Sequence, residues 1–249
     1  MYQALHQRGL WSLDELSSSD AQALLSTAQA LKQSNGGGLP LKGKHVAVLC
    51  EHPLGAAADV FTAAARGLGA QVTRIRPSAS GLTESGELQD TARVLGRLYD
   101  AIECDGLGQA FMLELARTAA VPLSNVLLQE RHPTRMLADV MTMQEIGAEP
   151  FKALTVCVAG GERTMWSVAW RQIAAVTGID VIAGAPPGAS GHNTPPITFV
   201  CDPRGQRCAD GHPALLAVHR DDPVEVSLAQ RQMVNHRFVV QALLTHTIN

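Results

Sequence analysis

The chain has 249 residues, with 20 lysine and arginine residues against 23 aspartate and glutamate residues, and its formal charge is −3. This slightly acidic balance offers no basic surface to neutralise a phosphate backbone, so nucleic acid is excluded as an expected partner. A hydrophobic fraction of 46% with 17% charged residues is typical of a globular core. No run reaches the roughly 20 apolar residues that span a membrane, and the N-terminus lacks the basic and apolar regions of an export signal. The sequence therefore predicts a soluble, cytoplasmic protein with no membrane partner.

The first part of the chain alternates predicted helices and strands. Residues 13–33 carry leucine and alanine on one helical face behind N-cap side chains at 17–20, and glycines at 36–38 end this helix. Strand–helix–strand steps produce a parallel sheet, so residues 1–147 are predicted to form an α/β domain. Its further strands and helices are expected at 45–50, 59–69, 71–76, 87–99, 101–104, 108–119, 121–126 and 134–147.

A second, truncated α/β domain is predicted over residues 148–227. Its first strand, at 153–160, runs into Gly160 and Gly161 before a helix at 164–178. A glycine turn that feeds a helix can bind an anion through backbone N–H groups. This turn does not match the GxGxxG dinucleotide pattern, and a plain strand-to-helix turn is the alternative. Residues 184–214 are rich in Gly, Pro, Asn and Ser and are expected to be loop, apart from the strand ITFVCD.

Several segments agree in order and spacing with one family of enzymes. They are residues 41–70, residues 84–109, residues 121–145 with the sequence RHPTR, and residues 229–244. These segments resemble the aspartate/ornithine carbamoyltransferase family, with ornithine carbamoyltransferase as the most similar branch. The resemblance implies a carbamoyl-phosphate domain and an amino-acid domain, each built on a parallel sheet, and no cofactor is expected. It also implies a homotrimer with active sites shared between subunits, and a last helix, 228–249, that packs back on the first domain.

The residues that would hold carbamoyl phosphate depart from the family pattern. The family's phosphate loop reads Ser-Thr-Arg-Thr-Arg, whereas this chain has Leu54, Gly55 and Ala56 followed by two more alanines, none of which has a side-chain donor. A family arginine that follows the next strand falls on Asp105, and the arginine of the last helix falls on Gln232. Hydrogen bonds to charged groups contribute roughly 1.5–3 kcal/mol each. The sequence therefore predicts that carbamoyl-phosphate binding is lost.

The motif RHPTR retains part of the family chemistry. In the family its histidine polarises the carbamoyl carbonyl, so His132 is the candidate catalytic residue, and Thr134 beside it is also kept. The alternative for His132 is a structural histidine at a helix start. The glutamine of the family's His-Pro-x-Gln motif falls on Arg135. This arginine could pair with Asp105 across the emptied pocket, which would spare a buried carboxylate the cost of remaining unpaired, or it could be a new anion receptor.

Cysteine and histidine residues raise two further questions. The five cysteines are expected to be reduced thiols. Cys104 precedes Asp105 and could face the pocket as a nucleophile, but no partner base is evident, so a packed thiol is expected. Two cysteines and two histidines in residues 192–212 are candidate zinc ligands. Their spacing lacks the close ligand pairs of structural zinc sites, so a loop without metal is expected. The four candidate ligands are His192, Cys201, Cys208 and His212.

The amino-acid side of the expected site is reduced as well. The family has an Asn-rich turn after the first strand of its second domain, whereas the corresponding turn here, GGERTMWS, contains no Asn. The chain between ITFVCD and the last helix is also shorter than in the family. The sequence therefore favours a non-catalytic or re-purposed homologue with an amino-acid-like ligand. Alternatives are an enzyme that acts on a different small molecule in the remodelled pocket, and a residual carbamoyltransferase of arginine or ornithine metabolism.

Overall fold

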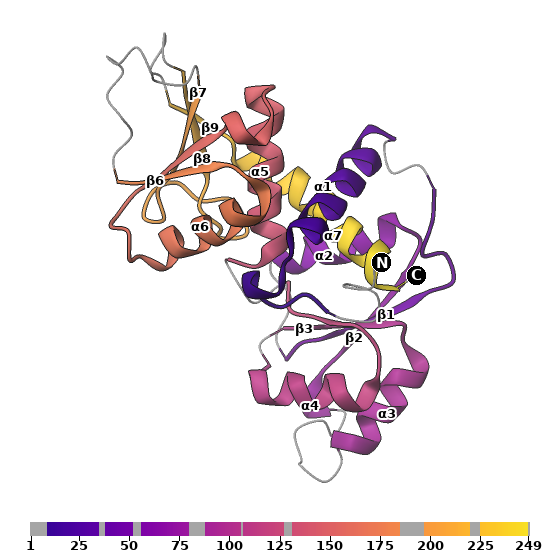
Figure 1. Cartoon of the computed structure of the whole chain (residues 1–249). Helices are drawn as coiled ribbons and strands as arrows, with labels where there is room; N and C mark the ends of the chain where they lie inside the picture. Colours follow the sequence, from indigo (N-terminus) through magenta and orange to yellow (C-terminus); the bar gives the residue numbers. More distant parts are fainter. Residues whose placement is uncertain are drawn as a thin grey trace.

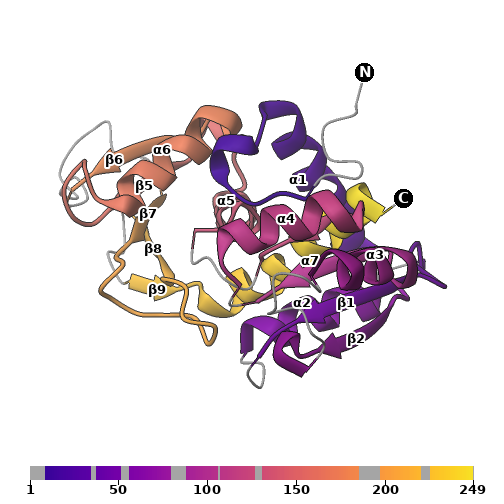
Figure 2. The same ribbon diagram turned by 90° about the horizontal axis from the view of Figure 1, so that it is seen from below.

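The structure is a computed structural model, and it describes residues 9–34, 38–51, 56–79, 88–105, 107–126, 131–184, 197–219 and 225–248. In these residues the strands form two sheets, one of four strands and one of five. The sheets lie at opposite ends of the molecule, and helices α5 (Pro133–Gly147) and α7 (Ala229–Ile248) run between them (Figures 1 and 2).

The first sheet has the strand order β2-β1-β3-β4, and all its strand pairs are parallel. The parallel α/β domain expected from the alternating pattern is thereby confirmed. The strands are β1 (His45–Leu49), β2 (Gln71–Ile75), β3 (Ala101–Cys104) and β4 (Leu123–Ser124). The helices are α1 (Ser18–Gln33), α2 (Ala56–Gly67), α3 (Leu88–Leu98) and α4 (Gln109–Ala119).

Strand β1 buries both of its faces. Val46 and Val48 join a core with helices α1, α2, α5 and α7, while Ala47 and Leu49 join a second core under α3 and α4. Successive side chains of a strand point to opposite faces, and a strand covered on both faces reads as a continuous apolar run. Figure 1 shows α3 and α4 on one side of this sheet and α2 and α7 on the other.

The second sheet has the order β6-β5-β7-β8-β9 and is mixed. Its strands are β5 (Thr155–Val158), β6 (Asp180–Ala183), β7 (Ile197–Cys201), β8 (Leu215–His219) and β9 (Glu225–Ser227), and its helix is α6 (Met165–Thr177). Strands β6, β5 and β7 pair in parallel, whereas β8 and β9 add on antiparallel. The sequence interpretation did not foresee β8 and β9. Residues 202–214 between β7 and β8 form no helix, and without a crossover helix the chain returns antiparallel.

Local start signals fix two of the helices. The hydroxyl of Ser17 accepts a hydrogen bond from the main-chain N–H of Asp20 at 3.1 Å, so α1 begins where its N-cap was expected. At the glycine turn, Thr164 caps α6 by accepting from Ser167 N–H at 3.1 Å, and the Ser167 hydroxyl donates to the carbonyl of Gly161 at 3.0 Å. The glycine turn after β5 is thus held by hydrogen bonds at the start of α6, the helix that follows it.

Helix α7 packs against α5, α1 and α2, so it lies on the same side of the first sheet as α2. Lys32 of α1 joins three helices, because its Nζ lies 2.7 Å from Glu145 Oε1 of α5 and 2.7 Å from Asn235 Oδ1 of α7. Helix α5, which belongs to the predicted first domain, also contacts α6 of the predicted second domain. The domain boundaries at residues 147 and 227 therefore stay predictions. Among the described helices, α7 included, none combines the length and the apolar character needed to cross a membrane.

Candidate functional site

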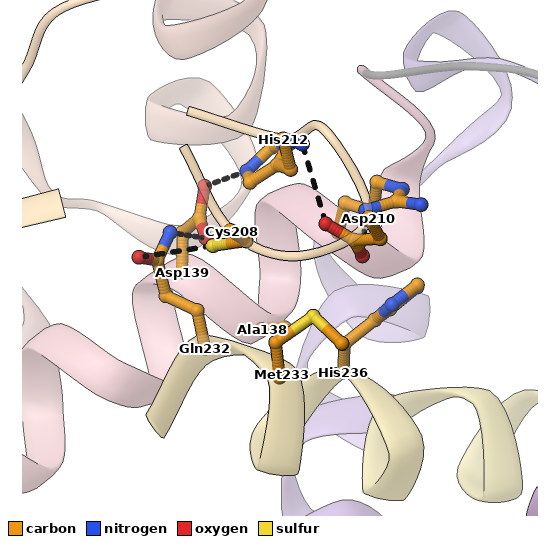
Figure 3. Close-up of a pocket in the computed structure, with 9 residues that line it drawn as sticks. Ala138, Asp139, Cys208, Asp210, His212, Gln232, Met233 and His236 are labelled. Atoms are coloured by element: carbon orange, nitrogen blue, oxygen red, sulfur yellow. Dashed lines mark hydrogen bonds and ion pairs between the residues drawn. The ribbon is translucent and has the colours of Figure 1, made fainter. Parts of the chain in front are cut away.

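A small cavity, with several polar side chains around it, lies where helices α5 and α7 meet the loop of residues 202–214 (Figure 3). Its volume is about 10 Å³, which is roughly the space of one water molecule. Helix α5 contributes Arg135 and Asp139, and α7 contributes Gln232 and His236. The cavity therefore includes the positions of two predicted site residues, Arg135 and Gln232.

Internal hydrogen bonds shape the loop that closes this cavity. Arg207 Nη1 donates to the carbonyl of Gly211, and its Nη2 donates to the carbonyl of Pro203 at 2.9 Å. Gly211 has a φ of +87°, a left-handed conformation that glycine adopts without strain. This turn directs the side chains of Asp210 and His212 toward α5 (Figure 3).

Arg135 forms a buried ion pair with Asp210, through Nη1 and Oδ2. The two side chains are only 5% and 2% exposed. Among the described residues, the carboxylate paired with Arg135 is thus Asp210, and a pair with Asp105, which the sequence left open as one alternative, is not the one found. Asp105 follows β3, where its N–H donates to the carbonyl of Leu49 at 2.8 Å, whereas the loop brings Asp210 directly onto α5. Removing one member of such a buried pair would leave a charge without compensation.

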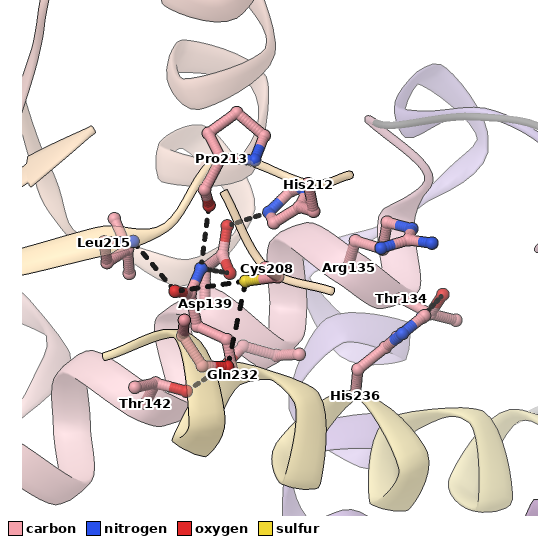
Figure 4. Close-up of polar contacts among 12 residues, drawn as sticks. Thr134, Arg135, Asp139, Thr142, Cys208, His212, Pro213, Leu215, Gln232 and His236 are labelled. Carbon is pink, nitrogen blue, oxygen red and sulfur yellow. Dashed lines mark hydrogen bonds and ion pairs between the residues drawn. The ribbon is translucent and has the colours of Figure 1, made fainter. Parts of the chain in front are cut away.

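A second buried contact lies one helical turn further along α5. The His212 ring donates through Nε2 to Asp139 Oδ2 at 2.8 Å, and Gln232 Nε2 donates to Asp139 Oδ1 at 2.7 Å (Figure 4). Gln232 Oε1 in turn accepts from Leu215 N–H at 2.8 Å. The rings of Trp166 and His212 pack against each other in an edge-to-face arrangement, with ring centroids 5.5 Å apart. Gln232 therefore holds the loop and the start of β8 where the resemblance placed a ligand-binding arginine.

His132 is fully buried and caps helix α5. Its Nε2 donates to the carbonyl of Leu10 at 2.8 Å, and its Nδ1 accepts from Thr134 N–H at 3.2 Å. The proton is placed on Nε2 because a carbonyl oxygen can only accept. Burial is the main cause that lowers the pKa of His132 to about 4. His132 is thus a neutral imidazole with both ring nitrogens engaged inside the protein.

Thr134 links His132 to the last helix. Its Oγ1 lies 2.8 Å from His132 Nδ1 and 3.2 Å from His236 Nε2. Burial and the nearby Arg135 guanidinium hold the pKa of His236 well below its ordinary value, so this ring is neutral too. Because His132 Nδ1 is an acceptor, the hydroxyl donates to it and accepts from His236 Nε2.

Other candidate residues lie away from the cavity. Cys104 is packed with Leu49 and Leu115 in the core under α3 and α4, and burial raises the pKa of its thiol well above the ordinary value. Leu54 and Gly55 lie outside the described residues, and α2 begins at Ala56, whose side chain lies outside them as well. The structure thus gathers His132, Thr134, Arg135 and Gln232 but not Cys104.

Three of the four candidate zinc ligands fall in the described residues, and His192 lies outside them. Burial raises the pKa of both Cys201 and Cys208 to about 12. Cys208 Sγ lies 3.7 Å from Gln232 Oε1, while His212 is bonded to Asp139. In the part of the chain that the structure describes, no group of three or more His, Cys, Asp or Glu residues is arranged to hold a metal ion.

Sequence reasoning missed Asp139, Asp210 and His236. One signal was present: the stretch of α5 from Pro133 to Met143 is buried, and its two charged residues, Arg135 and Asp139, are four positions apart. Such spacing places them on one helical face. Nothing in the loop sequence indicated which of its polar residues would meet them.

Comparison with known proteins assigns this fold to a class. Residues 8–145 match the family model described as "Aspartate/ornithine carbamoyltransferase, carbamoyl-P binding domain". The chain belongs to this family, as its sequence resemblance implied.

The most similar curated relatives include two bacterial enzymes. The ornithine carbamoyltransferase of Cutibacterium acnes is 38% identical over 187 residues, which cover 74% of this chain and 56% of the relative. The catabolic ornithine carbamoyltransferase of Burkholderia mallei is 40% identical over 185 residues, which cover 73% of this chain and 55% of the relative. The chain therefore spans a little over half the length of the curated relatives that it matches.

Two solved structures support the same fold. Ornithine carbamoyltransferase from Gloeobacter violaceus superimposes with a TM-score of 0.68 at 18% identity, covering 98% of this chain and 99% of that one. Aspartate transcarbamoylase from Trypanosoma cruzi, in complex with aspartate and phosphate, gives a TM-score of 0.68 at 17% identity, covering 99% and 97%. At these identities the likeness shows the fold, and it confirms the expected carbamoyltransferase-type architecture.

Proposed function

We propose that this chain is an ornithine carbamoyltransferase-like protein that has lost carbamoyl-phosphate binding and serves as a non-catalytic or re-purposed homologue. The observation that carries the proposal is that the protein's own side chains fill the expected ligand site at the start of α5. Arg135 is paired with Asp210, and the cavity beside it has a volume of about 10 Å³. Carbamoyl phosphate is much larger than the single water molecule that such a volume admits.

The state of His132 supports the same proposal. A histidine that polarises a substrate carbonyl must donate a ring N–H to it. The Nε2–H of His132 already donates to the main-chain carbonyl of Leu10. The ring is neutral, so its other nitrogen has no proton to donate. Asp139 and Asp210 add two carboxylates beside the cavity, where a phosphate dianion would be repelled.

A residual carbamoyltransferase is the second candidate, because the curated relatives at 38% and 40% identity are ornithine carbamoyltransferases. It predicts citrulline formation from ornithine and carbamoyl phosphate. The test compares this chain with the Cutibacterium acnes enzyme under identical conditions, beside calorimetric titration of carbamoyl phosphate alone. Turnover near 1 per second, or a dissociation constant below about 1 mM, would refute the loss of carbamoyl-phosphate chemistry.

The assembly and location of the protein are further parts of the proposal. We propose a homotrimer formed through the first sheet and its helices, and a cytoplasmic location. Family resemblance over residues 8–145 supports the trimer. Light scattering on the purified chain tests it, and a stable monomer at micromolar concentration would contradict it.

A further inference from the structure

The guanidinium of Arg135 stands at an unfavourable place for a cation. Helix α5 begins at Pro133, so Arg135 lies in its first turn, where the helix dipole is positive. The side chain is also only 5% exposed, which removes the solvent that would otherwise stabilise the charge. A buried cation at this end of a helix needs an anion beside it.

Asp210 supplies that anion but uses only part of the guanidinium. Its Oδ2 accepts from Arg135 Nη1, whereas Arg135 Nε is buried and has no hydrogen-bond partner among the described residues. A guanidinium presents its N–H groups as a planar fork that matches both oxygens of a carboxylate. The Nε–H is therefore an unused donor of a carboxylate-binding fork, and it belongs to a side chain that lines the cavity.

The main-chain donors of the same helical turn are already engaged. Pro133 has no N–H, and the N–H of Thr134 donates to His132 Nδ1 at 3.2 Å. The N–H groups of Arg135 and Met136 donate to the carbonyl of His132 at 2.9 and 3.2 Å. An anion at this place would thus be held by the guanidinium and not by the helix end.

From these contacts we infer that Arg135 is the receptor for a small carboxylate ligand, and that Asp210 occupies this receptor as an internal ligand. One guanidinium without helix N–H groups suits a monoanionic carboxylate. A phosphate dianion would meet the carboxylates of Asp139 and Asp210 in the same cavity. The inference deepens the proposed function, on which it rests, because it names the ligand class of the re-purposed site.

Asp210 can be changed without removing the turn that carries it. Its Oδ1 accepts from His212 N–H at 3.2 Å, and an asparagine oxygen can make the same bond. The loop is otherwise held by Arg207, whose bonds go to Pro203 and Gly211. Asp210→Asn therefore keeps the turn and removes the charge that competes for Arg135. It does not enlarge the cavity of about 10 Å³, so acetate must bind by displacing the neutral side chain from Arg135, which the charged side chain of Asp210 would resist.

The experiment measures melting temperature against sodium acetate, with sodium chloride at equal ionic strength as the reference, because a ligand that binds the folded state raises the melting temperature. We expect acetate to stabilise Asp210→Asn saturably, with an apparent affinity at least about tenfold higher than for the unsubstituted chain. The same titration of Arg135→Gln with Asp210→Asn should show no acetate effect beyond that of chloride.

Several outcomes would overturn the inference. They are an absent acetate effect in Asp210→Asn, an equal effect in the double variant, and an equal or stronger effect of inorganic phosphate. If Asp210→Asn unfolds without ligand, the measurement becomes the recovery of cooperative unfolding by acetate, with Asp210→Ala as the second variant. Carbamoyl phosphate is titrated against the unsubstituted chain in parallel. Binding in that titration would contradict the proposed function, and this result is independent of the acetate titrations.

Discussion

His212 Nε2 lies 2.8 Å from Asp139 Oδ2, and this contact joins residues 73 positions apart. The carboxylate also accepts from Gln232, so one side chain of α5 holds both the loop of residues 202–214 and helix α7. All three side chains are buried. Asp139 is therefore the point at which the second sheet is fastened to the two helices that lie between the sheets.

Replacing Asp139 with alanine should lower the free energy of unfolding by about 2–4 kcal/mol, because buried donors of His212 and Gln232 would lose their acceptor. Denaturant unfolding followed by circular dichroism measures this change. Asp90→Ala is the matched control, since Asp90 is 83% exposed and pairs only on the surface with Arg93. That control should shift the free energy by no more than about 0.5 kcal/mol, and equal effects of the two substitutions would contradict the fastening role.

The buried histidines predict acid destabilisation. Burial lowers the pKa of His132 from 6.5 to about 4, so the unfolded chain binds a proton at pH values where the folded ring stays neutral. Stability should therefore fall as the pH drops from about 6.5 to about 4, by up to about 3 kcal/mol from this one group, and His132 should add no further loss below that range. His236 shifts in the same direction and adds to the loss.

Unfolding free energies measured between pH 7.5 and pH 4 test this dependence. The variant His132→Gln keeps a side-chain donor for the carbonyl of Leu10 but cannot be protonated. It should be less stable at pH 7.5 and show a shallower fall with acid. An unchanged slope in the variant would show that His132 does not contribute to the acid sensitivity.

Local patterns were sufficient for much of the fold. The N-cap of α1 at Ser17 and the parallel first sheet follow from local sequence patterns, and both agree with the structure. The site was harder to predict, because the partner of Arg135 lies 75 residues away in a loop whose composition indicates only that it is loop. The resemblance to the family placed Asp105 near Arg135. No periodic signal pointed to Asp210.

The cysteines should be unreactive in the folded protein. All five are buried and free of disulfides, and burial raises the thiol pKa of each. Because the thiolate is the reactive form, a thiol reagent at pH 8 should label the native chain slowly. Unfolding in guanidinium chloride should expose all five for rapid labelling. Fast native labelling of Cys208 would show that the loop of residues 202–214 opens readily.

Restoring the family's arginine at Gln232 should not restore the family's chemistry. Gln232 Oε1 accepts from the N–H of Leu215, and an arginine side chain has no acceptor. Gln232→Arg should therefore leave that buried N–H unpaired and lower the free energy of unfolding by about 1–3 kcal/mol. Gln230→Arg makes the same change at an exposed position of α7 and serves as the matched control.

The measurements for Gln232→Arg are the melting temperature and the calorimetric titration of carbamoyl phosphate. We expect a lower melting temperature than for Gln230→Arg and no binding with a dissociation constant below about 1 mM. The reason is that the Arg135–Asp210 pair would still fill the start of α5. A variant that kept its melting temperature and bound carbamoyl phosphate would show that one arginine is enough to restore the site. That result would contradict the proposal that the Arg135–Asp210 pair blocks carbamoyl phosphate.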